Sequence, residues 1–134
     1  MKISTKVQYG LRAMAYLAQN SKDNRAISVR EIAIREKIPG DYLEKIFAKL
    51  LKAKMLAAKK GVRGGYIMIR PANEIKISEI FSTLENSLTK VKCIDAECAR
   101  EHGCLTRCLW VKMQAAIDDF LASVTLEDLI NKKF

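Results

Sequence analysis

The sequence predicts a mainly α-helical protein with a small β-hairpin, arranged as a winged helix-turn-helix followed by a long C-terminal dimerisation helix. Three observations support this fold class. Two short helical segments flank a break at Ile38-Pro39-Gly40, two strand-like segments with a glycine-rich connection follow, and helical periodicity returns over residues 105–124. A helix, a tight turn, a second helix and a hairpin wing together make a known DNA-binding motif.

The two short helices are predicted from capping residues and apolar periodicity. Ser28 is followed three residues later by Glu31, the signature of a capping box, so a helix should begin at Val29. The second helix is expected over residues 41–54, with Asp41 as its N-cap. Its predicted buried stripe consists of Leu43, Ile46, Phe47, Leu50 and Leu51. Its opposite side is expected to carry Lys45, Lys49 and Lys52.

A basic hairpin is expected after the second helix. Residues 55–58 and 66–69 have the composition of strands, and three glycines in the connection can adopt positive φ. The connection also carries Lys59, Lys60 and Arg63. Residues 45–63 contain seven Lys or Arg and no Asp or Glu, whereas a plain solvated surface usually mixes both signs. We therefore expect binding to nucleic-acid phosphates, with an ordinary charged surface as the alternative.

The net charge is concentrated in the same half of the chain. Residues 1–75 hold 16 Lys or Arg and 6 Asp or Glu, a balance of +10, while residues 76–134 hold 8 and 9, a balance of −1. No apolar run is long enough to span a bilayer and no signal peptide is recognisable, so a cytoplasmic protein without a membrane partner is expected. The single His and the lack of a phosphate-binding glycine loop argue against an enzyme.

Further helical segments flank the helix-turn-helix and the wing. Residues 1–20 have apolar positions at helical spacing behind Ser4, a short helix should begin at Ile77, and Thr125 should cap a last helix. Residues 105–124 would form a rod too long to bury its apolar stripe on so small a body, so we predict a dimerisation helix. Packing of this helix into the protein's own core is the alternative.

The chain is thus divided into two parts by predicted role. Residues 1–75 are expected to form the winged helix-turn-helix DNA-binding domain, and residues 76–134 a cysteine loop (92–104) and the dimerisation helix. Two reading helices related by a two-fold axis would recognise a pseudo-palindromic operator in double-stranded DNA. Its half-sites would be about 34 Å apart, or a multiple of that spacing.

All four cysteines lie in this second part, in the spacing C-x4-C-x5-C-x3-C. Disulfides are not expected in a reducing cytoplasm, and the tight C-x2-C pair of common zinc sites is missing. The polar sequence around the cysteines is unusual for core thiols. Soft thiolates on a loop suit an iron–sulfur cluster, while zinc, a thiol redox switch and the absence of any metal are alternatives.

Five motifs occur in order along nearly the whole chain. They are Met1-Lys2-Ile3-Ser4-Thr5-Lys6 with Tyr9-Gly10-Leu11, Tyr42-Leu43-Glu44, Gly64-Gly65-Tyr66, Cys104-Leu105-Thr106 leading to Trp110, and Thr125-Leu126-Glu127-Asp128-Leu129. Together they resemble the Rrf-two family of bacterial winged-helix transcription regulators, which has IscR-, NsrR- and CymR-like members. The resemblance implies a homodimer that binds promoter DNA, with a three-cysteine site for a [2Fe–2S] or [4Fe–4S] cluster.

The resemblance implies three cluster ligands: Cys93, Cys98 and Cys104. The first gap between them is one residue shorter than is common in the family. The fourth ligand is open, because IscR-like members have a histidine where this chain has Arg107, and NsrR-like members an acidic residue where it has Gln8. Arginine cannot bind iron. The local candidates are Cys108 and, inside the loop, His102, with a small-molecule ligand as a further alternative.

On the DNA side, the resemblance places Tyr42 and Glu44 at the start of the reading helix. Glu44 could accept a hydrogen bond from cytosine N4, and Tyr42 could contact a phosphate. An exposed carboxylate and a half-buried aromatic are the plain alternatives. Lys60 has the position of a wing arginine that enters the minor groove, and Arg63 is expected to share that role. The DNA-binding candidates are Ser28, Tyr42, Glu44, Lys45, Lys49, Lys59, Lys60 and Arg63.

The sequence therefore predicts a homodimeric transcription regulator, expected to act as a repressor, whose promoter binding is controlled by an iron–sulfur cluster. The signal would be iron–sulfur, redox or nitric oxide status. Ligation would order residues 92–104 and shift the population of DNA-competent dimers. A cluster-free regulator that senses through zinc, cysteine thiols or a partner protein is the alternative.

Overall fold

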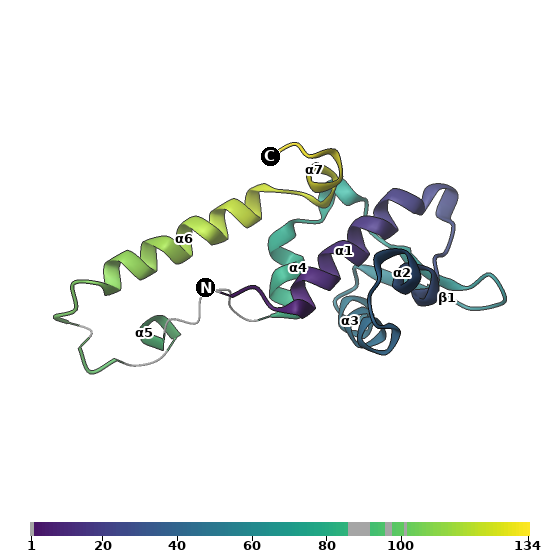
Figure 1. The fold of residues 1–134 in the computed structure, drawn as a ribbon. Helices are drawn as coiled ribbons and strands as arrows, with labels where there is room; N and C mark the ends of the chain where they lie inside the picture. The colour runs from purple at the N-terminus through teal and green to yellow at the C-terminus, as the bar shows by residue number, and fades with distance from the viewer. Residues whose placement is uncertain (1, 86–91, 96–97, 101) are drawn as a thin grey trace.

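The helix-turn-helix is formed by α2 (Val29–Glu36) and α3 (Gly40–Lys52), which pack beside α1 (Thr5–Asn20). The computed structural model describes residues 2–85, 92–95, 98–100 and 102–134. The later elements are β1 (Leu56–Lys59), β2 (Gly65–Met68), α4 (Ile77–Leu84), α5 (Lys92–Asp95), α6 (Arg107–Ser123) and α7 (Leu126–Asn131), with short 3-10 turns at Lys22–Asn24 and Ala72–Glu74. Figure 1 shows the hairpin projecting from one end of the helical body and α6 extending from the other.

The expected caps hold the helix ends in place. Ser4 Oγ accepts from the backbone N–H of Val7 at 3.3 Å, and Ser28 Oγ accepts from that of Glu31 at 3.1 Å. The prediction of a complete capping box at Ser28 is wrong, because the Glu31 carboxylate does not accept from the Ser28 N–H. It accepts hydrogen bonds from Arg25 and Tyr16 instead. Thr125 forms the complete capping box of the chain's last helix, α7.

The reading helix α3 begins earlier than its sequence pattern suggested. Its first residue is Gly40 and its N-cap is Pro39, whose carbonyl accepts from the Leu43 N–H at 3.0 Å, so the prediction of Asp41 as N-cap is wrong. Pro39 has φ −58° and ψ 127°, outside the helical region as is typical of an N-cap residue, and no side chain among the described residues caps this helix end. Leu51 is 37% exposed rather than buried, since one residue beyond Leu50 rotates it off the core stripe.

Both strands of the hairpin lie one residue nearer its tip than the predicted strands. Its register pairs Leu56 with Met68 and Lys59 with Gly65. A backbone bridge joins it to the chain before α2: the Ile27 N–H donates to the Tyr66 carbonyl at 3.0 Å, and the Tyr66 N–H donates to the Ile27 carbonyl at 2.8 Å. These bonds fix the wing to the start of the helix-turn-helix.

The C-terminal segments share the core of the N-terminal ones. Both α4 and α7 contact α1, and a bridge between Lys76 and Thr125 ties the start of α4 to the end of α6. Ile80, Leu84 and Leu126 are fully or almost fully buried in the same hydrophobic cluster as the helix-turn-helix. Two of the C-terminal helices, α4 and α7, thus complete the body that supports the reading helix. The division of the chain at residue 75 into a DNA-binding part and a sensing and dimerisation part stays a prediction.

The long helix α6 extends from this body along most of its length (Figure 1). It begins at Arg107 rather than at residue 105, and none of its 17 residues is buried. The cysteine loop predicted over residues 92–104 includes one helical turn, α5, and lies partly outside the described residues. Within the described part of the chain, no helix is both long and apolar enough to cross a membrane.

Candidate DNA-binding surface and cysteine segment

The reading helix presents a polar outer side. Leu43, Ile46, Phe47 and Leu50 are buried, which leaves Glu44, Lys45 and Lys49 exposed on the same helix. Tyr42 is half-buried, and its ring meets that of Tyr9 on α1 edge-to-face at 5.7 Å between centroids. The aromatic contact restricts the Tyr42 ring while the hydroxyl end stays available to a partner, as tyrosines at interfaces commonly do.

The wing carries its cations at its tip. Lys59 ends β1, and Lys60 and Arg63 lie in the connection to β2; all three are exposed, as is the apolar Val62 between them. Ser28 is half-buried and serves as the N-cap of α2, a position next to the Ile27–Tyr66 bridge. The fold thus brings the candidates other than Ser28 onto two adjoining elements, α3 and the wing. Their contact with DNA stays a prediction.

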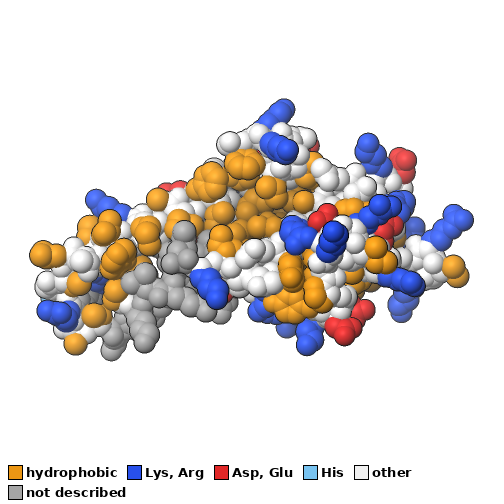
Figure 2. All heavy atoms as spheres, in the orientation of Figure 1, with side chains coloured by type: hydrophobic (Ala, Val, Ile, Leu, Met, Phe, Trp, Pro, Cys, Tyr) orange, Lys and Arg blue, Asp and Glu red, His pale blue; other side chains and the backbone are white. Residues whose placement is uncertain are grey.

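The exposed cations of α3 and the wing form no salt bridge within the described residues. The salt bridges of the described residues join Arg12 to Glu36, Arg25 to Glu31 and Arg70 to Glu79, and none of them involves a lysine of α3 or a cation of the wing. Figure 2 shows Lys and Arg side chains gathered over the half of the molecule that holds the wing and helix-turn-helix. An exposed set of cations without acidic partners is the expected footprint of a phosphate-binding surface.

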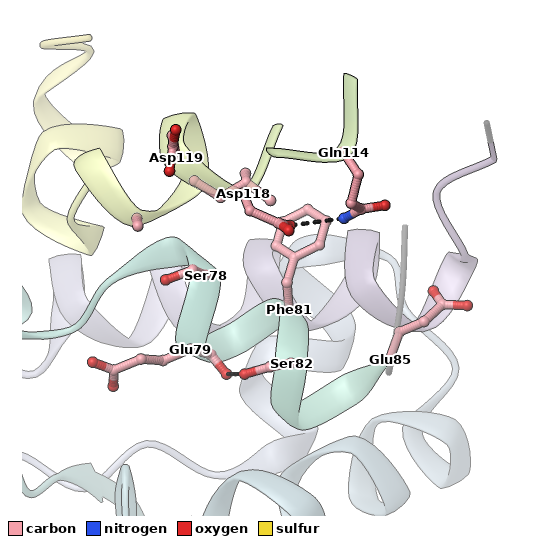
Figure 3. A pocket seen from close by; sticks show the side chains of 10 residues that line it. Ser78, Glu79, Phe81, Ser82, Glu85, Gln114, Asp118 and Asp119 are labelled. Carbon is pink, nitrogen blue, oxygen red and sulfur yellow. Dashed lines mark hydrogen bonds between the residues drawn. The ribbon is translucent and has the colours of Figure 1, made fainter. Parts of the chain in front are cut away.

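The groove between α4 and α6 has the opposite character. It encloses about 480 Å³, and its lining combines apolar side chains such as Phe81 with four carboxylates, those of Glu79, Glu85, Asp118 and Asp119. In Figure 3 the Gln114 amide lies over the groove and donates to the Asp118 carboxylate at 2.9 Å. Carboxylates would repel phosphate, so this side of the body is unsuited to DNA.

The exposed apolar side chains of α6 are the most conspicuous hydrophobic feature outside the core. Leu109 is 58% exposed, Val111 40% and Phe120 52%, and the preceding Leu105 is 96% exposed. Figure 2 shows hydrophobic side chains along α6 and in the region between α6 and α1. Leu109 and Phe120 lie on the same side of α6, and exposed apolar side chains that share one side of a helix are typical of an interaction site.

The cysteines lie at the start of α6 and before it. Cys93 is on α5, Cys98 and Cys104 are in non-helical segments, and Cys108 is in the first turn of α6. All four are free thiols; Cys108 is exposed and the other three are partly exposed. Among the described residues, no three His, Cys, Asp or Glu side chains are grouped closely enough to hold a metal ion.

Cys104 has the most distinctive environment. Its Sγ lies 3.3 Å from Thr106 Oγ1. Hydrogen bonds from the Thr106 hydroxyl, and then from the backbone N–H groups of Thr106 and Arg107, lower the pKa of the Cys104 thiol. The thiolate is the form that binds metals and reacts with oxidants, so the donor chemistry of this segment fits a thiolate-ligated group. The predicted alternative ligand His102 is exposed nearby.

A helix-turn-helix with one buried side, the exposed side of its second helix α3 and the basic wing together define a winged-helix DNA-binding protein. A family model described as an iron-dependent transcriptional regulator, Rrf2, matches residues 3–132. The chain belongs to the Rrf2 family, which is the Rrf-two family that its motifs resemble.

Individual relatives cover nearly the whole chain. IscR of Pectobacterium carotovorum, an HTH-type transcriptional regulator, is 33% identical over 134 residues, which are 99% of this chain and 81% of that protein. The structure of IscR from T. potens matches with a TM-score of 0.81 and 33% identity, covering 100% of this chain and 89% of that one. CymR, the global cysteine regulator of B. subtilis, matches with a TM-score of 0.85 and 30% identity over 98% of both chains. These matches identify a transcriptional regulator and not an enzyme.

None of the residues selected from the sequence as DNA contacts lies on α1, yet α1 adjoins the reading helix. Tyr9 packs on Tyr42, and the Arg12 guanidinium lies 5.7 Å from the centre of the Tyr9 ring. The signal was present in the sequence, because Lys6, Tyr9 and Arg12 recur at three-residue steps and so fall on one side of a helix. Only the packing of α1 against α3 reveals which side that is.

Proposed function

We propose that this protein is a cytoplasmic, homodimeric repressor that binds a pseudo-palindromic operator and responds to a signal received by its cysteine segment. The observation that supports DNA reading best is the joint exposure of α3 and the wing, whose cations lack acidic partners among the described residues. In this proposal Glu44 reads a base in the major groove, and Lys60 and Arg63 enter the minor groove. Phosphates are contacted by Tyr42, Lys45, Lys49 and Lys59.

The proposed dimer uses α6. A helix of 17 residues is about 25 Å long, and none of its residues is buried in the monomer. Leu109 and Phe120, which lie on one side of α6, would bury their exposed apolar surface against α6 of a second copy, which removes the hydrophobic cost of leaving them in water. The two reading helices would then be related by a two-fold axis, as a pseudo-palindrome requires.

For the sensor, we propose that Cys93, Cys98 and Cys104 hold an iron–sulfur cluster, with Cys108 or His102 as candidates for the remaining ligand. The lowered pKa of Cys104 supports this proposal, because a thiolate is needed for ligation. When bound, such a cluster would supply a redox-sensitive link among the cysteines. Residues 92–104 would be held in one arrangement by ligation and released without it, which would change the position of α6 relative to the body.

The same cysteines support a second candidate, a thiol sensor without a cluster. The lowered pKa of Cys104 also favours reaction with oxidants, and a cysteine regulator is among the structural relatives. Cys108 is exposed in the first turn of α6, four residues after Cys104, and could react with the same agents. Neither candidate changes the proposed DNA surface.

An ultraviolet–visible spectrum with iron and sulfide analysis, on protein purified without oxygen, separates the two sensors. A cluster predicts broad absorbance in the visible region that is lost in Cys104→Ala and kept in Thr106→Val, which retains all four cysteines. A colourless, iron-free protein after anaerobic reconstitution would exclude the cluster. Loss of DNA binding on mild oxidation, restored by a thiol reductant, would then support the thiol sensor.

A further inference from the structure

Arg12 on α1 is bound to the last residue of α2. Its Nε lies 3.5 Å from a carboxylate oxygen of Glu36, and its Nη2 donates a hydrogen bond to the backbone carbonyl of the same residue. Backbone carbonyls in the last turn of a helix have no partner within the helix, and the helix dipole favours a cation there. Arg12 therefore holds the end of α2 in place, directly before the turn of the helix-turn-helix at residues 37–39.

The same guanidinium lies beside an aromatic pair that reaches the reading helix. Arg12 Cζ is 5.7 Å from the centre of the Tyr9 ring, within the range of cation–π attraction. The Tyr9 ring meets that of Tyr42 edge-to-face, with 81° between the ring planes, an arrangement that aromatic pairs favour. Tyr42 is the third residue of α3, so these contacts connect the end of α2 with the first turn of the reading helix.

The start of α3 depends on such a neighbour, because its own cap gives it little support. The N-cap residue is Pro39, which makes no side-chain hydrogen bond to the helix. Before it, Lys37 ends α2 in the left-handed conformation, with a φ of 53°. The direction of the first turn of α3 is therefore set by what packs against it, and α1 contacts both helices of the motif.

The contacts of Arg12 distinguish it from the cations of the reading surface. Its charge is balanced by Glu36, whereas the lysines of α3 and the cations of the wing form no salt bridge in the described part of the chain. A planar guanidinium can donate to a carboxylate and lie against an aromatic ring at the same time, which the ammonium group of a flexible lysine does less well. Arg12 is thus suited to join parts of the protein rather than to bind a phosphate.

We propose that Arg12 is a positioning residue for DNA reading: by joining Glu36 to Tyr9, it fixes the first turn of α3 relative to α2. This inference rests on the proposed function, in which Tyr42 contacts a phosphate and Glu44 reads a base from the start of the same helix. A binding group of this kind has to be held within about 0.5 Å of its productive position. Loosening the first turn should therefore weaken binding to the operator more than binding to duplexes of other sequence.

The test compares Arg12→Lys with the wild type on two duplexes, one selected from a random pool and one of scrambled sequence. The variant keeps the charge and loses the planar fork. Affinity for the selected duplex should fall about tenfold and affinity for the scrambled duplex by less than about twofold, with an unchanged slope of log affinity against log salt. Arg70→Lys is the matched control and should keep the wild-type ratio of affinities. Arg70 also pairs with a carboxylate, that of Glu79, and both residues lie outside α1, α2 and α3.

A second pair of variants tests the route through Tyr9. Tyr9→Leu removes the ring between Arg12 and Tyr42 and should lower the preference for the selected duplex. Adding Arg12→Lys to Tyr9→Leu should then lower this preference by less than Arg12→Lys does in the wild type, because the two side chains act through one series of contacts. Additive losses in logarithmic units would overturn the proposal, since Arg12 would not act through Tyr9.

Other results would overturn the positioning role and leave the proposed function standing. A wild-type ratio of affinities in Arg12→Lys is one of them, and a salt dependence shallower by about 2 per dimer in Arg12→Gln would then make Arg12 a phosphate contact. Equal losses of affinity for both duplexes, together with a lower urea midpoint, would make Arg12 a purely structural residue. A wild-type protein that selects no sequence and shows no salt-dependent duplex binding would overturn the proposed function itself.

Discussion

Gly65→Ala should detach the wing from the helix-turn-helix. Gly65 has a φ of +156°, and a Cβ at this position would meet the backbone of Ile27 and would lie 2.7 Å from the backbone nitrogen of Ser28. Backbone atoms cannot rotate away as a side chain can. The new methyl group is therefore accommodated only if the hairpin moves off the Ile27–Tyr66 bridge.

The expected cost follows from these contacts. A non-glycine residue in a sparsely populated backbone region costs about 1–3 kcal/mol. Losing the two bridge hydrogen bonds, of 3.0 and 2.8 Å, adds about 1–3 kcal/mol at 0.5–1.5 kcal/mol each. Gly65→Ala should thus destabilise the protein by about 2–6 kcal/mol, a large part of the 5–15 kcal/mol typical of a domain.

Gly61→Ala is the matched control. Gly61 also has a positive φ, +117°, but a Cβ there has open space around it, so only the conformational cost applies. Urea denaturation followed by circular dichroism would measure both variants, and duplex affinity would be measured on the fraction that remains folded. Equal losses of stability in Gly61→Ala and Gly65→Ala would refute the contact between Gly65 and the chain before α2.

Further variants test the support and the surface of the reading helix. Glu31→Gln should destabilise the protein at neutral pH, because hydrogen bonds from Arg25 and then Tyr16 hold the pKa of Glu31 below its ordinary value. The ionised Glu31 contributes this stability above a pH of about 4.3, and the contribution is lost as the pH falls through the lower pKa of the folded state. The difference in stability between Glu31→Gln and the wild type should therefore narrow in acid. A difference in denaturation midpoint that stays constant across pH would be the contrary result. Glu44→Ala should relax base preference at one operator position, whereas Lys60→Ala should weaken binding to nearly all duplexes. A gel-shift titration on operator variants distinguishes them, and the docking is wrong if both variants bind as the wild type does.

Much of the fold could be predicted because the local signals agree with one another. Ser4, Ser28 and Thr125 cap helices where their sequence positions predict, and the periodicity of α3 gave most of its buried side. One error, the capping box at Ser28, arose where a neighbour in space decides. Glu31 leaves its capping partner because Arg25 and Tyr16 compete for the carboxylate, and the latter belongs to another helix.

The candidate site was predictable in composition and less so in arrangement. The exposed cations of α3 and the wing follow from charge and periodicity, but the place of Tyr9 beside Tyr42 depends on how α1 packs on α3. The cysteine spacing fits thiolate chemistry, while the lowered pKa of Cys104 comes first from the Thr106 hydroxyl and then from the backbone N–H groups of Thr106 and Arg107. Sequence gives the ligand types of such a site, and tertiary structure gives their electrostatics.

The central claim is that two copies of this chain read DNA together, and selection of binding sites from a random duplex pool tests it directly. The selected duplexes are predicted to share two inverted half-sites with centres about 34 Å apart, or a multiple of that spacing, since each protomer places one α3 in the major groove. Their binding should weaken steeply with salt. Enrichment of a single unpaired half-site would contradict the dimer, and no enrichment at all would contradict sequence-specific DNA reading.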